Sequence, residues 1–113
     1  MGKDKDKTSK QAGLPAHAGQ PAQARLHAVV SGTVQGVNFR YYTARQAEML
    51  GVTGWVANRW DGTVEVVAEG TRADLQALLD WLEHGPPSAH VDNVVPAWEE
   101  PAGEFESFRV RYL

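Results

Sequence analysis

Hydrophobic periodicity that begins near residue 25 restricts the fold of this chain more than any other feature. Apolar side chains occupy alternate positions through residues 26–30 and Gly32 closes the run, which is typical of a half-buried strand. Residues 39–50 instead place Phe, Thr, Ala and Leu at helical spacing, and Gly51 follows as a stop signal. The pattern therefore predicts a strand followed by a helix.

The same two patterns recur along the rest of the chain. Asp61 and Gly62 form a turn signal between two alternating runs, which indicates a hairpin. Thr71 is a candidate helix N-cap ahead of a leucine stripe, and Gly85 with two prolines ends that second helix. The further predicted strands are residues 52–57, 63–69, 91–97 and 107–112.

The predicted order is strand, helix, strand, strand, helix, strand, with one more strand added before the end. Two helices and a mostly antiparallel sheet of four to five strands form a two-layer α+β sandwich. The βαβ pieces favour a ferredoxin-like split βαβ arrangement, with both helices on one face of the sheet. This fold carries many unrelated functions, so the chemistry has to be argued from particular residues.

Residues 1–24 differ in composition from residues 25–113. Their only large apolar residues are Met1 and Leu14, too few to offset the entropy of ordering them. We therefore expect a disordered tail followed by one domain. No apolar segment follows the tail lysines, so we expect no secretion signal and a cytoplasmic location. The sequence gives no clear sign of assembly, and we expect a monomer.

Composition excludes several classes of partner. Residues 25–113 hold seven arginines, no lysine and twelve acidic residues, a net charge of −5, which argues against nucleic-acid binding. No apolar run approaches the roughly 20 residues that span a bilayer, so we expect no membrane partner. There is no cysteine, and the four histidines lack metal-ligand spacing, so we expect no metal site.

The segment 33–40 is the first candidate for chemistry. It connects a strand to a helix and contains Gly36, which adopts backbone conformations closed to other residues. Such a loop can turn several N–H groups toward one anion at the positive end of the helix dipole. Arg40 lies in the first helical turn, and its planar guanidinium matches two phosphate oxygens. The alternative is a structural loop with a solvated arginine.

Asn58 is the second candidate. It ends the second predicted strand, where asparagine is also a common turn residue. Spacing alone does not show that Asn58 faces Arg40. In a ferredoxin-like sheet, however, the first strand–helix loop and the end of the next strand can lie close together.

These two segments resemble the two signatures of the acylphosphatase family. The first signature corresponds here to Val30-x-Gly32-x-Val34-Gln35-Gly36-Val37-x-Phe39-Arg40. The second corresponds to Gly54-Trp55-Val56-Ala57-Asn58-x-x-x-Gly62-x-Val64. The resemblance extends over about residues 25–113. Two long signatures in the right order and on the right elements are a specific signal.

The resemblance implies a hydrolase that cleaves acyl phosphates to a carboxylate and inorganic phosphate, without a metal or organic cofactor. Inorganic phosphate is then both product and inhibitor. The implied catalytic residues are Arg40, which binds the phosphate, and Asn58, which orients the attacking water. The implied phosphate-binding backbone amides are those of Gln35, Gly36, Val37, Asn38, Phe39 and Arg40.

Two other functions compete with hydrolysis. A noncatalytic phosphate- or anion-binding regulatory module needs the loop and Arg40, but it has no use for a water-orienting Asn58. A single-stranded nucleic-acid binder needs basic and aromatic residues on neighbouring sheet positions, and the sequence offers no basic cluster of that kind. The joint presence of Arg40 and Asn58 therefore favours the enzyme.

Overall fold

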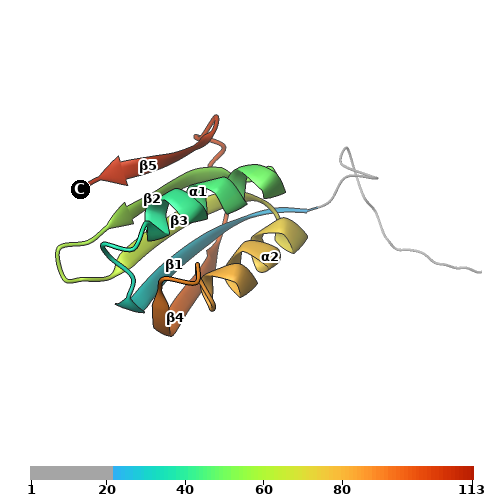
Figure 1. The fold of residues 1–113 in the computed structure, drawn as a ribbon. Coiled ribbons are helices and arrows are strands. Elements are labelled where there is room, and N and C mark those ends of the chain that lie inside the picture. Colours follow the sequence, from blue (N-terminus) through green and yellow to red (C-terminus); the bar gives the residue numbers. More distant parts are fainter. Residues whose placement is uncertain (1–21) are drawn as a thin grey trace, which may run out of the picture.

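Two helices lie side by side on one face of a five-stranded sheet (Figure 1). The computed structural model describes residues 22–113, so the predicted disorder of residues 1–21 concerns a segment outside the described part. The elements are β1 (Gln23–Thr33), α1 (Phe39–Leu50), β2 (Thr53–Asn58), β3 (Val64–Thr71), α2 (Arg72–Leu82), β4 (His90–Glu99) and β5 (Phe108–Tyr112). None of the helices in residues 22–113 is long and apolar enough to cross a membrane.

The strands run in the order β4-β1-β3-β2-β5, and only β2 and β5 pair in parallel. Helix α1 packs on β2 and β5, whereas α2 packs on β1, β3 and β4. This arrangement confirms the predicted α+β ferredoxin-like fold, with five strands where four to five were expected. The parallel β2–β5 pair brings the end of the chain beside the middle of the sequence.

Strand β1 starts earlier than the sequence pattern predicts. Gln23 and Ala24 pair with Thr71 and Gly70 of β3, so two residues assigned to the tail are part of the sheet. Their side chains carry no strand signal of their own. The backbone hydrogen bonds of β3 extend the strand to Gln23, two residues before the predicted boundary.

The core lies between the sheet and the helices. Leu26, Ala28 and Val30 of β1 are fully buried, which confirms the predicted alternation. The leucine stripe of α2 faces the same space, and each fully buried side chain of this size contributes about 1.5–3 kcal/mol. The buried residues of the two helices are Phe39, Thr43, Ala47, Leu75, Leu78, Leu79 and Leu82.

The caps of both helices match the predictions. Gly51 follows α1 with a φ of 76°, and its N–H donates to the last turn of that helix. Thr71 precedes α2, and its hydroxyl oxygen accepts a hydrogen bond from the N–H of Asp74 at 3.1 Å. These caps fix where α1 ends and where α2 begins relative to the sheet beneath them.

Gly32 sets the direction in which β1 leaves the sheet. The register between β1 and β4 shifts between Ser31 and Gly32, where φ is 129°. A Cβ atom at Gly32 would lie 2.2 Å from the carbonyl oxygen of His90. Only glycine permits this approach, and the bulge directs the chain into the loop ahead of α1.

Candidate active site

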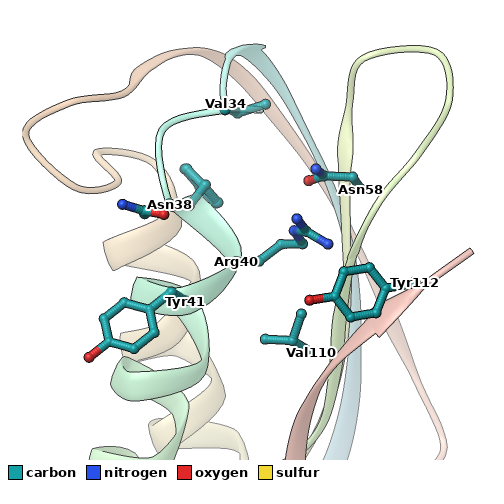
Figure 2. A pocket seen from close by; sticks show the side chains of 9 residues that line it. Val34, Asn38, Arg40, Tyr41, Asn58, Val110 and Tyr112 are labelled. Atoms are coloured by element: carbon teal, nitrogen blue, oxygen red, sulfur yellow. The ribbon is translucent and has the colours of Figure 1, made fainter.

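A cavity of about 370 Å³ opens where the β1–α1 loop, the start of α1 and the ends of β2 and β5 meet. Three segments that are distant in sequence thus contribute to one hollow, shown from close by in Figure 2. The lining residues are Val34, Gly36, Asn38, Phe39, Arg40, Tyr41, Asn58, Val110 and Tyr112. Among residues 22–113 this lining includes no Asp, Glu or His, so the cavity has no ionised carboxylate to repel an anion.

The β1–α1 loop has two left-handed residues. Gly36 has a φ of 77° and Asn38, the N-cap of α1, has a φ of 63°. The Asn38 side chain makes no capping hydrogen bond. Hydrogen bonds among residues 22–113 use none of the backbone N–H groups from Gln35 to Tyr41 as donors. The first turn of α1 also contains no acidic residue, so nothing on the helix neutralises its positive end.

Arg40 extends from the first turn of α1 into the cavity. Its guanidinium carbon lies 4.8 Å from the centroid of the Tyr112 ring, a cation–π contact. Within residues 22–113 Arg40 forms no ion pair and no side-chain hydrogen bond, although the domain is acidic. Its five N–H donors therefore remain available to a ligand.

Asn58 is the last residue of β2 and faces the same cavity. Figure 2 shows the side chains of Arg40, Asn58 and Tyr112 pointing toward one another, whereas Asn38 and Tyr41 point away. Asn58 is in register with Tyr112 of β5. Its side-chain oxygen Oδ1 is buried and has no hydrogen-bond partner within residues 22–113. A buried acceptor without a partner is destabilising, so this atom needs a donor that a bound molecule can supply.

The hairpin that follows Asn58 is tightly bonded. The Arg59 N–H donates to the carbonyl oxygen of Thr63 at 2.8 Å. Asp61 accepts hydrogen bonds from the Thr63 hydroxyl at 2.7 Å and from its N–H at 3.0 Å, within the turn that the Asp-Gly signal predicted. These bonds hold the pKa of Asp61 below its ordinary value. Trp60 at the tip is fully exposed and does not line the cavity.

Three contacts brace the β1–α1 loop from outside the cavity. The Gln35 side chain donates from Nε2 to the carbonyl oxygens of Arg59 and Thr63. Ser88 donates from its hydroxyl to the carbonyl oxygen of Val37 at 3.0 Å. Gly85, with a φ of 69°, lies so close to the Phe39 ring that a Cβ would approach it to 2.8 Å. The loop is thus held by the β2–β3 hairpin on one side and by the α2–β4 connection on the other.

The structure brings most of the predicted site residues together. Gly36, Asn38, Phe39, Arg40 and Asn58 all line the cavity. The side chains of Gln35 and Val37 do not line it, because that of Gln35 donates to the hairpin and that of Val37 packs against the core. Only the backbone N–H groups of these two residues remain candidates for binding phosphate.

Sequence reasoning missed four lining residues: Val34, Tyr41, Val110 and Tyr112. The alternation of the last strand places Val110 and Tyr112 on one face of the sheet, and it is the one sequence signal that could have grouped them. The pairing of their strand with β2, which brings them to the cavity, has no signature in the sequence.

Within residues 22–113, no three His, Asp or Glu side chains lie close enough together to hold a metal ion. The fold and the cavity define a small α+β domain with a cationic pocket at the start of its first helix.

Comparison with known proteins identifies the family. The sequence model of the acylphosphatase family matches residues 26–110. The acylphosphatase of Pelotomaculum thermopropionicum is 52% identical over 91 residues, which are 80% of this chain and 99% of that protein.

Solved structures of acylphosphatases also match this chain. The crystal structure of acylphosphatase from Bacillus subtilis matches with a TM-score of 0.76 at 32% identity, over 79% of this chain and 99% of that one. The structure of an acylphosphatase from Coxiella burnetii matches with a TM-score of 0.71 at 47% identity, over 79% and 93%. The chain belongs to the acylphosphatase family and is an enzyme that hydrolyses acyl phosphates.

Proposed function

We propose that the β1–α1 loop and Arg40 hold the phosphoryl group of an acyl phosphate while Asn58 orients the attacking water. One observation supports this most strongly. Arg40 and Asn58 come from different elements, line one cavity and have no ion-pair or side-chain hydrogen-bond partner within residues 22–113. A cation and a buried carboxamide oxygen are the two groups needed to place an anion beside a water molecule.

The phosphoryl group binds at the positive end of α1. The N–H groups from Gln35 to Arg40 and the guanidinium of Arg40 are its donors. Free backbone amides at a helix N-terminus favour an anion, and a guanidinium can bond two of its oxygens at once. Because these donors are fixed before the reaction, they stabilise charge that develops in the transition state without reorganising.

The attacking water binds to Asn58. The buried Oδ1 accepts one hydrogen bond from that water, which satisfies the acceptor. A neutral carboxamide orients water without repelling the phosphoryl oxygens, whereas a carboxylate there would repel them. Asn58 thus acts through hydrogen-bond geometry rather than as a base.

The reaction needs no protein acid. Water oxygen bonds to phosphorus as the bond between phosphorus and the acyl oxygen breaks, and the bonding pair leaves with the carboxylate. The conjugate acid of that leaving group has a pKa of about 4–5, so it departs unprotonated at neutral pH. One proton of the water passes to a phosphoryl oxygen, and the other stays on the oxygen that is now bonded to phosphorus. Such phosphoryl transfer depends mainly on positioning and charge stabilisation.

Hydrolysis of a small synthetic acyl phosphate in ¹⁸O-labelled water tests this assignment. Attack at phosphorus puts the label in inorganic phosphate. Label in the carboxylate instead would mean attack at the acyl carbon and would contradict the proposal. Equal rates with and without a chelator are expected, because the proposed steps use only groups of this chain.

A further inference from the structure

The side chain of Gln35 joins two parts of the molecule that contribute to the cavity. Its Nε2 atom lies 2.6 Å from the carbonyl oxygen of Arg59 and 2.9 Å from that of Thr63. Both N–H bonds of the amide are therefore used, and both bonds are partly buried. Two such bonds fix the position of Gln35 relative to the hairpin.

The two carbonyl groups lie at the neck of the β2–β3 hairpin. Arg59 directly follows Asn58, and Thr63 accepts a second hydrogen bond from the Arg59 N–H at 2.8 Å. The Gln35 amide thus binds the hairpin at the point where the hydrogen bond between Arg59 and Thr63 closes its loop. Its own backbone belongs to the loop that precedes Arg40. The side chain is a direct bridge from the loop to the residue after Asn58.

The covalent chain that joins the loop to Asn58 is much longer than the bridge through the Gln35 side chain. The chain between Gln35 and Asn58 runs through the whole of α1 and β2. In-line attack requires reacting atoms at about 3–3.5 Å, and a displacement of about 1 Å can lower the rate about 100-fold. We propose that the Gln35 side chain is a positioning residue, which holds Asn58 at its working distance from the phosphate-binding loop. This inference rests on the proposed roles of Asn58 and the loop.

The positioning role of Gln35 can be distinguished experimentally from a role in phosphate binding. The side chain of Gln35 does not line the cavity, and substituting it leaves the backbone N–H in place. The bond from Ser88 to Val37 and the packing of Gly85 on Phe39 also remain, because they brace the loop from the α2–β4 connection. The loop should therefore keep its shape while the hairpin shifts. Turnover should fall without a matching loss of phosphate affinity.

Gln35→Met tests the bridge, because methionine has a similar shape and no N–H donor. We expect kcat to fall by about tenfold or more, while the inhibition constant of inorganic phosphate rises by less than about threefold. Gln35→Glu should lose at least as much turnover, since its carboxylate faces two carbonyl oxygens. Gln35→Asn keeps the donors on a shorter chain and should fall between wild type and the methionine variant.

Gln76→Met is the matched control. Gln76 also donates from Nε2, to Asp80 at 2.9 Å, but on the exposed side of α2. We expect its kcat and phosphate inhibition to equal those of wild type. Thermal unfolding of each variant shows whether the fold is intact.

Wild-type kcat in Gln35→Met would overturn the inference, as would a phosphate inhibition constant that rises more than kcat falls. Were Gln35→Met not to fold, wild-type kcat in both Gln35→Asn and Gln35→Glu would overturn it. Failure of the proposed function gives a different result, because Arg40 and Asn58 variants would then keep full turnover. Full turnover in the Gln35 variants alone would overturn only the positioning role.

Discussion

The guanidinium of Arg40 stacks on the ring of Tyr112, with 4.8 Å between the guanidinium carbon and the ring centroid. Tyr112 is in turn the β5 residue in register with Asn58. The parallel β2–β5 pair therefore places the aromatic ring beside the carboxamide and beneath the cation (Figure 2). This contact aims Arg40 into the cavity before any anion binds.

Tyr112→Leu should weaken phosphate binding. A cation–π contact at an exposed position contributes about 0.5–1 kcal/mol, so the inhibition constant of phosphate should rise about two- to fivefold. Tyr112→Phe keeps the ring and should behave as wild type. Inhibition assays on both variants check this, and equal behaviour of the phenylalanine and leucine variants would remove the ring from the account.

Asn58→Ala should lower kcat by about 100-fold or more, because the water loses its only proposed fixed acceptor. Phosphate inhibition should change by less than about threefold, since Asn58 is assigned to water. Asn93→Ala, on an exposed position of β4, is the control and should have wild-type turnover. Normal turnover of Asn58→Ala would return this residue to a turn role.

The pH profile of kcat should be nearly flat around neutrality. The cavity lining within residues 22–113 includes no carboxylate and no imidazole, the side chains that most often serve as acid or base near neutral pH. We expect kcat to vary by less than about threefold between about pH 6 and pH 9. A bell-shaped profile with an ionisation near pH 7 would indicate a protein acid or base.

Gly54→Ala and Gly62→Ala separate the cost of a positive φ alone from the cost of a positive φ combined with a steric clash. Both glycines have positive φ, 140° and 94°, but a Cβ at Gly54 would lie 1.9 Å from the Val67 carbonyl oxygen, whereas Gly62 has open space. We expect Gly62→Ala to lower the free energy of unfolding by about 1–2 kcal/mol. Gly54→Ala should lower it by about 3 kcal/mol or more. Denaturant unfolding measures the free energy of unfolding of both variants. Equal losses would mean that the contact between a Cβ at Gly54 and the Val67 carbonyl oxygen carries no extra cost.

Local features of the fold were predictable from the sequence. Helix α1 has the predicted bounds, and Gly51 and Thr71 cap the helices as expected. Helix spacing and helix caps depend on residues close together in sequence, so the local sequence pattern is enough to predict them. The alternation of β1 likewise reports which side chains face the core.

Contacts between distant segments were not predictable in the same way. The bridge from Gln35 to the hairpin depends on how the loop folds over β2, and nothing near Gln35 encodes it. The place of Tyr112 depends on which strand β5 joins, because alternation reports a face and not a neighbour. Spacing did not place Arg40 beside Asn58 either. The predicted ferredoxin-like fold allowed the two to lie close together and the family resemblance implied one shared site; the structure puts both on one cavity.

The turnover and phosphate inhibition of Arg40→Gln show whether this cavity is where the phosphoryl group binds and reacts. Glutamine removes the charge and the fork of donors and leaves a shorter, neutral polar side chain. We expect kcat to fall about 100- to 1000-fold and the inhibition constant of inorganic phosphate to rise, because a preorganised donor to the phosphoryl group is lost. Wild-type turnover with unchanged phosphate inhibition would contradict the account, since the cavity would then not be where the phosphate binds.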